Sequence, residues 1–101
     1  MDFFNLFQSK SARLKLFLKQ NPILLDVRNP SELKNNAISK AVNFPLDELY
    51  TNLSNLDKNA AYVVFCRSGN RSRNALELMQ KNEFKNVFDA GSIKELRTAL
   101  C

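Results

Sequence analysis

Short apolar runs alternate with segments of helical periodicity along almost the whole chain, and this alternation limits the folds open to it. Parallel strands need a crossover connection, usually a helix, between one strand and the next. The alternation therefore predicts an α/β fold, a small and mostly parallel sheet flanked by helices on both faces. The predicted strands are 23–27, 41–44, 61–65 and 86–88, and the predicted helices are 9–20, 29–35, 46–53, 72–82 and 92–100.

Local capping signals support several of the predicted helices. Ser9 or Ser11 can cap the first helix. The stretches 29–32 and 92–95 have the spacing of a capping box, with a polar residue followed three positions later by a glutamate. Asp89-Ala90-Gly91 is rich in turn-forming residues, so we expect the chain to turn there before the last helix.

Length and charge limit the class of protein. A chain of 101 residues predicts one domain over 1–101 with a real hydrophobic core. The net charge is +5, but the lysines are scattered and no nucleic-acid motif is present, so we expect no nucleic-acid partner and a surface that attracts small anions. No apolar stretch is long enough to cross a membrane, and the N-terminus lacks the features of a signal peptide. We therefore expect a cytoplasmic protein without a membrane partner.

Cysteine and histidine usage narrows the chemistry. The chain has two cysteines, Cys66 and Cys101, and no histidine. This excludes a disulfide framework, a Cys–His dyad and a histidine metal site, so we expect neither a metal nor another cofactor. Cys101 can act as a resolving thiol, but an incidental terminal thiol is the interpretation we favour. The cluster of Phe3, Phe4 and Phe7 either docks a partner or packs on the first helix.

The strongest candidate for chemistry is a cysteine at the end of the predicted strand 61–65, followed by a polar loop and a helix start. Backbone N–H groups of such a loop can form an anion-binding nest, and the helix dipole adds positive charge. Arginines add full charges, so the pattern predicts a thiol of lowered pKa and a reactive thiolate. The residues are Cys66 and the loop Arg67, Ser68, Gly69, Asn70 and Arg71, with Arg73 just beyond.

A buried structural cysteine is the plainer interpretation, because free cysteine is among the most buried residue types. The loop argues against it. Gly69 gives the freedom that a tight turn needs, and the small polar residues Ser68 and Asn70 contribute nothing to a core. Ser68 either donates to the sulfur anion or satisfies the loop, and both roles stay open.

Asp26 and Arg28 follow the first predicted strand and form a second candidate group. Ligands of parallel sheets bind outside the carboxyl ends of the strands, so these two residues can line the rim of the same site. A turn is the interpretation we favour. In it, Asp26 accepts backbone N–H bonds and Arg28 pairs with Glu32.

Three motifs in order, Leu25-Asp-Val-Arg28, Ala41-Val-Asn-Phe-Pro-Leu-Asp-Glu-Leu49 and Val64-Phe-Cys-Arg-Ser-Gly-Asn-Arg-Ser72, closely resemble the rhodanese family in its single-domain form. The resemblance extends over about residues 9–98. It implies a thiosulfate sulfurtransferase with the rhodanese-like fold. In such an enzyme Cys66 is the nucleophile and persulfide carrier, the loop 67–71 holds the anionic donor, and Arg67 and Arg71 contact its charge.

The resemblance also implies the partners. The donor is thiosulfate or a similar small anion, and the acceptor is cyanide, a thiol or a protein; it does not indicate an oligomeric state. The stretch Asn36-Ala-Ile-Ser-Lys-Ala41 departs from the family, which commonly has two glycines and a histidine there.

Two other functions stay open. One is a sulfur-delivery or interaction module with little thiosulfate turnover. The other is a small cysteine-dependent phosphatase or arsenate reductase. In this chain four residues separate Cys66 from Arg71, whereas phosphatases of similar fold have a loop one residue longer, so the shorter loop argues against this function.

Overall fold

The computed structural model describes residues 8–101, and its centre is a four-stranded sheet in the order β2-β1-β3-β4. Every neighbouring pair of strands is parallel, which confirms the predicted sheet type. The strands are β1 Ile23–Asp26, β2 Val42–Asn43, β3 Tyr62–Cys66 and β4 Val87–Ser92. The cluster Phe3, Phe4 and Phe7 lies outside the described residues.

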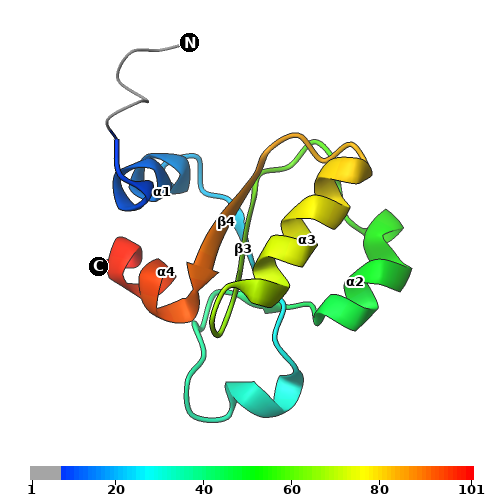
Figure 1. Cartoon of the computed structure of the whole chain (residues 1–101), viewed down its shortest axis with the longest axis horizontal. Helices are drawn as coiled ribbons and strands as arrows, with labels where there is room; N and C mark the ends of the chain where they lie inside the picture. The colour runs from blue at the N-terminus through cyan, green and yellow to red at the C-terminus, as the bar shows by residue number, and fades with distance from the viewer. Residues whose placement is uncertain (1–7) are drawn as a thin grey trace.

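Helices cover both faces of this sheet, as Figure 1 shows. One face packs against α2 Leu46–Asn52 and α3 Asn70–Lys81, and the other against α1 Lys10–Leu18 and α4 Ile93–Leu100. Two short 3₁₀ helices, η2 Pro30–Leu33 and η3 Leu53–Asn55, lie in the connections. The predicted α/β architecture with helices on both faces is therefore confirmed. Among the described residues, no helix combines the length and the apolar character that crossing a bilayer requires.

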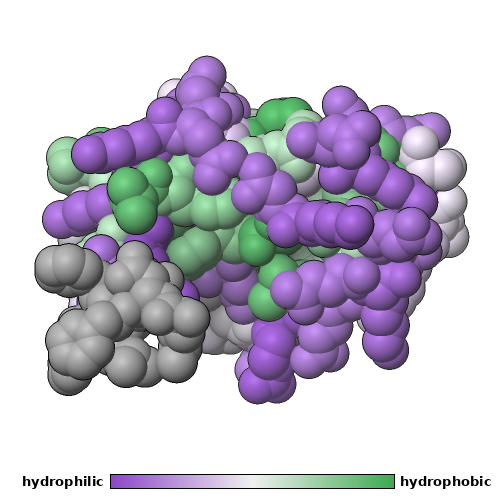
Figure 2. All heavy atoms as spheres, turned by 90° about the horizontal axis from the view of Figure 1, so that it is seen from above, coloured by the Kyte–Doolittle hydropathy of each residue, from purple (hydrophilic) through white to green (hydrophobic). Residues whose placement is uncertain are grey.

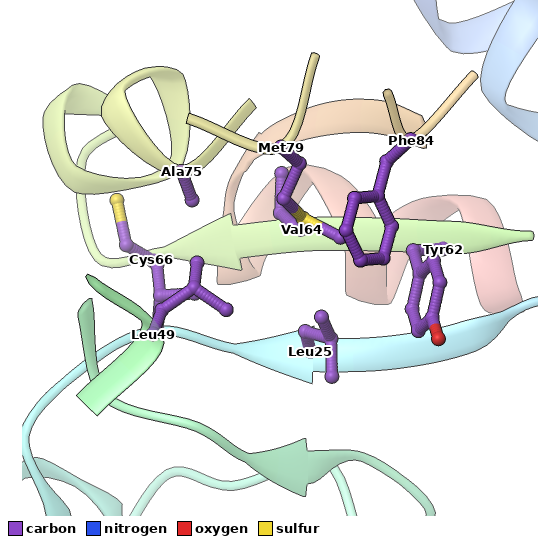
Figure 3. Packing of buried hydrophobic residues seen from close by; sticks show 9 residues of the cluster. Leu25, Leu49, Tyr62, Val64, Cys66, Ala75, Met79 and Phe84 are labelled. Atoms are coloured by element: carbon purple, nitrogen blue, oxygen red, sulfur yellow. The ribbon is translucent and has the colours of Figure 1, made fainter. Parts of the chain in front are cut away.

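Strand β3 explains why the sheet must be covered on both sides. All five of its residues are buried, which is typical of a central parallel strand. Its side chains alternate: Tyr62, Val64 and Cys66 belong to the core beneath α2 and α3, whereas Val63 and Phe65 belong to the core beneath α1 and α4. Figure 3 shows the first of these cores, with Cys66 at one end of it.

Polar side chains dominate the face of the molecule seen from above. Figure 2 shows one face of the molecule, where hydrophilic side chains predominate and hydrophobic ones appear between them. Two helices begin at the caps that the sequence predicts. Ser9 accepts a hydrogen bond from the N–H of Ala12 at 3.0 Å and begins α1. Ser92 and Glu95 form the capping box of α4, with bonds of 3.1 and 2.9 Å.

The predicted turn at 89–91 is wrong, because β4 continues through these residues to Ser92. The register shows the reason. Val64 pairs with Asp89 but Phe65 pairs with Gly91, so Ala90 is an extra residue in a β-bulge. Gly91 has a φ of 85°, a conformation that favours glycine. The turn-like composition therefore marks a bulge inside a strand.

The start of α3 also differs from the prediction. The helix begins at Asn70 rather than near Ser72, and Gly69 precedes it as N-cap with a φ of 104°. Arg71 consequently lies in the first helical turn. The segment between strand and helix is only Arg67 to Gly69.

We predict that Phe65→Ala lowers the free energy of unfolding by about 3–5 kcal/mol, because it removes a fully buried ring between the sheet and two helices. Urea denaturation measures this loss. Leu16→Ala is the matched control, since Leu16 is 57% exposed on α1, and it changes the free energy by less than about 0.5 kcal/mol. Equal losses in both variants would contradict the assigned core.

Candidate active site

Cys66 is the last residue of β3 and lies at the carboxyl end of the sheet, where the sequence placed it. Its side chain is buried between the strand and α3. In Figure 3 the sulfur points toward α3, on the side of Ala75. The short connection forces the chain to turn sharply, and Gly69 in its left-handed conformation permits that turn.

Main-chain N–H groups converge on the sulfur of Cys66. The N–H of Gly69 donates to Sγ at 3.0 Å, and the N–H of Ser72 donates at 3.4 Å. Both donors belong to the start of α3, where the first N–H groups of a helix have no partner within the helix. The helix start therefore forms an anion-binding site whose occupant is the cysteine of the same chain.

These contacts shift the titration of the thiol. Burial raises the pKa of Cys66, but hydrogen bonds from the backbone and hydroxyl of Ser72, and from the N–H groups of Gly69 and Ser68, outweigh it. The net result is a pKa below the ordinary value of the thiol. Donors to the anion stabilise the thiolate, which is the form that acts as a nucleophile.

Ser72 is fully buried and connects the loop to the bulge of β4. Its hydroxyl lies 3.1 Å from the carbonyl oxygen of Gly69 and 3.3 Å from that of Gly91. A Cβ on Gly69 would lie 3.7 Å from the Cα of Gly91, so the two glycines pack closely. Sequence reasoning missed the roles of Ser72 and Gly91. The position of Ser72 in the first turn of the helix could have indicated its role. No feature of the sequence indicates the role of Gly91.

Arg71 reaches across to η2 and forms an ion pair with Glu32. Its two terminal nitrogens donate to the two carboxylate oxygens at 2.5 and 2.9 Å. The hydrogen bonds from Arg71 lower the pKa of Glu32, burial opposes them, and the pKa falls from its ordinary 4.5 to about 2. Glu32 raises the pKa of Arg71 through its hydrogen bonds, and the charge of Cys66 raises it further. Arg71 is the neighbour of Ser72, whose N–H donates to the sulfur.

Asp26 and Arg28 pair with each other beneath the surface, at 1% and 2% exposure. The guanidinium binds the carboxylate through Nε and Nη2 at distances of 2.6 to 3.1 Å, and the N–H of Arg28 donates to the same carboxylate. Arg28 also donates to the carbonyls of Glu32 and Asn36. The turn contact of Asp26 is as expected, but the carboxylate partner of Arg28 is Asp26 rather than Glu32.

The remaining candidate residues lie outside this buried network. Arg67, Ser68, Asn70 and Arg73 are exposed around the start of α3. Cys101 is exposed after the end of α4, at the opposite end of that helix from Ser92. Within residues 8–101 no three His, Cys, Asp or Glu side chains come together in a way that would hold a metal ion.

Comparison with known proteins agrees with this architecture. A model of the Rhodanese-like domain family matches residues 11–97. YtwF from Bacillus subtilis is 36% identical over 64 residues, which are 63% of this chain and 62% of the relative, so the chain spans less than two thirds of that protein. The thiosulfate sulfurtransferase PspE from Escherichia coli is 30% identical over 74 residues, 71% of each chain.

Solved structures show the same fold. A rhodanese-related protein from Thermoplasma volcanium has a TM-score of 0.71 and 32% identity, over 83% of this chain and 87% of that one. A rhodanese with anions from E. coli has a TM-score of 0.68 and 29% identity, over 73% and 89% of the two chains.

We predict that the ion pair of Glu32 contributes to stability in a pH-dependent way. The pKa of Glu32 is lower in the folded chain, so its contribution is present above about pH 4.5 and is lost as the pH falls toward about 2. At neutral pH, Glu32→Gln therefore unfolds more easily than wild type by about 1–2 kcal/mol, and this difference shrinks on acidification.

Urea denaturation across this pH range tests the prediction. Glu77→Gln is the control, because it removes the same charge from an exposed position on α3. A difference between wild type and Glu32→Gln that stays constant with pH would contradict the ion pair.

Proposed function

The chain belongs to the rhodanese-like domain family, and on that premise we propose that it is a sulfurtransferase that carries sulfane sulfur as a persulfide on Cys66. The observation that supports this most directly is the pair of N–H bonds from Gly69 and Ser72 to the sulfur. They favour the thiolate, and the reaction requires a thiolate to begin.

In the first half-reaction, the Cys66 thiolate attacks the outer sulfur of thiosulfate. A new S–S bond forms, the bond between the two sulfurs of thiosulfate breaks, and sulfite leaves with the electron pair. The products are the Cys66 persulfide anion and sulfite, so charge and atoms balance. Backbone N–H groups at the start of α3 stabilise negative charge on sulfur, in the manner of an oxyanion hole.

In the second half-reaction, an acceptor nucleophile attacks the terminal sulfur of the persulfide. With cyanide, a carbon–sulfur bond forms, the S–S bond breaks, and Cys66 leaves as the thiolate while thiocyanate departs. A thiol or a protein thiolate serves as acceptor in the same way. The cycle is ping-pong covalent catalysis and consumes no cofactor.

Sulfur transfer is favoured over phosphoryl transfer by the size of the loop. Only four residues separate Cys66 from Arg71, and Gly69 and Ser72 already direct their N–H groups to the cysteine sulfur. Arg71 is bound to Glu32, so its charge is already compensated. A tetrahedral phosphate that must meet every N–H of the loop needs a longer loop than this one, so the short loop favours sulfur transfer.

We predict that incubation with thiosulfate adds the mass of one sulfur atom to the protein and that cyanide removes it. Intact-mass spectrometry measures both steps. Cys66→Ser shows no gain, and Cys101→Ser, the matched control at the other cysteine, behaves as wild type. No mass gain with thiosulfate, but a gain from a persulfidated protein, would instead support a sulfur-delivery module; turnover of an aryl phosphate would support a phosphatase.

We further predict that Arg71→Ala lowers kcat/KM for thiosulfate by about tenfold or more, whereas Arg73→Ala changes it by less than about twofold. Loss of Arg71 leaves the Glu32 carboxylate uncompensated near Cys66, which raises the pKa of the thiol and repels the donor. Arg73 is an exposed arginine on the same helix. Thiocyanate formation measures both variants, and equal effects would show that Arg71 has no special place in the site.

A further inference from the structure

Glu32 forms an ion pair with Arg71, the arginine that the sequence analysis expects to contact the anionic donor. Both terminal nitrogens of Arg71 donate to this carboxylate, and the two side chains are 32% and 25% exposed. A guanidinium held in this two-point geometry has its charge compensated by its partner. The full positive charge of Arg71 is therefore not available to bind a substrate anion.

The carboxylate is held in place from its own side as well. Glu32 Oε2 accepts the N–H of Asn29 at 3.0 Å, which closes the start of η2. The carbonyl of Glu32 accepts from Arg28, which is itself fixed by the buried Asp26. This chain of contacts connects Glu32 to the end of β1. The position of the carboxylate is therefore fixed by the fold.

Two of the arginines in this region consequently have their charge compensated by a carboxylate. Asp26 compensates Arg28, and Glu32 compensates Arg71. The exposed Arg67, next to Cys66, and the exposed Arg73 on α3 have no ion pair in the structure of residues 8–101. Arg71 neighbours Ser72, whose N–H donates to the sulfur, so the Glu32 carboxylate offsets positive charge close to the Cys66 thiolate. Each further negative charge on a donor adds to its repulsion by that carboxylate and by the thiolate.

We propose that Glu32 is a specificity-determining residue, which disfavours dianionic sulfur donors and selects donors with a single negative charge, such as thiosulfonates. The proposal rests on the sulfur-transfer function above. With a thiosulfonate, the Cys66 thiolate takes the outer sulfur, the sulfur–sulfur bond of the donor breaks, and a sulfinate leaves with the electron pair. The persulfide formed is the same as from thiosulfate, so only the charge of the donor differs.

The test compares two donors that differ by one charge, thiosulfate and methanethiosulfonate, with cyanide as acceptor. The readout is the ratio of their kcat/KM values. The fraction of folded protein and any change in the pKa of Cys66 affect both donors alike and cancel in this ratio. Glu32→Gln raises the ratio in favour of thiosulfate by about three- to tenfold, because a dianion gains more than a monoanion when a nearby negative charge is removed.

Two variants control this result. Glu77→Gln removes the same charge from an exposed site on α3 and leaves the ratio unchanged. Glu32→Asp keeps the charge on a shorter side chain and keeps the ratio close to that of wild type. If Glu32 only fastened η2 to α3, Glu32→Gln would slow both donors equally, and that outcome would overturn the proposal.

A binding measurement separates this proposal from the proposed function. In a Cys66→Ser background, Glu32→Gln tightens the binding of thiosulfate, measured by calorimetry, and Glu77→Gln does not. If wild type forms no persulfide with either donor, the sulfur-transfer function fails, while this binding comparison still decides the effect of Glu32 on dianions. Unchanged thiosulfate binding in Glu32→Gln would overturn the role of Glu32 even if sulfur transfer occurs.

Discussion

The site depends on two N–H groups that donate to a buried sulfur. Taking a negative charge out of water is costly unless hydrogen bonds replace the lost hydration. Gly69 and Ser72 supply those bonds from the start of α3. The fold makes this possible because the alternation along β3 directs Cys66 to the face that α3 covers, and the short connection brings the helix start over the sulfur.

The side-chain charges serve a different purpose from the backbone donors. Two of the arginines near the site have carboxylate partners, Arg28 with Asp26 and Arg71 with Glu32. A buried charge without a partner is strongly destabilising, so Arg28 needs Asp26, and the two pairs link η2 to β1 and to α3. The pair of Arg71 with Glu32 also compensates one of the three arginines that the sequence places around the cysteine. Activation of the thiol then comes mainly from main-chain hydrogen bonds.

The features that depend on local sequence pattern could be predicted, whereas contacts between residues far apart in the sequence could not. Apolar runs and caps were enough for the parallel sheet, the helices on both faces and the place of Cys66 at a strand end. The bulge at Ala90 arises from the register against β3, which composition does not encode. The partner of Arg71 is 39 positions away in η2, so the sequence of the loop does not show that one of its arginines is paired with a carboxylate.

The segment 36–41, where the sequence departs from the family, is connected to the same network of arginines. Asn36 accepts a hydrogen bond from Arg28 through its carbonyl and one from Arg97 through its side chain, both at 2.7 Å. These bonds tie the segment to β1 and to α4. In this chain, contacts to two arginines hold the segment where the family commonly has two glycines and a histidine. Backbone N–H groups lower the pKa of Cys66, while the arginines tie η2 and Asn36 to β1 and tie η2 to α3.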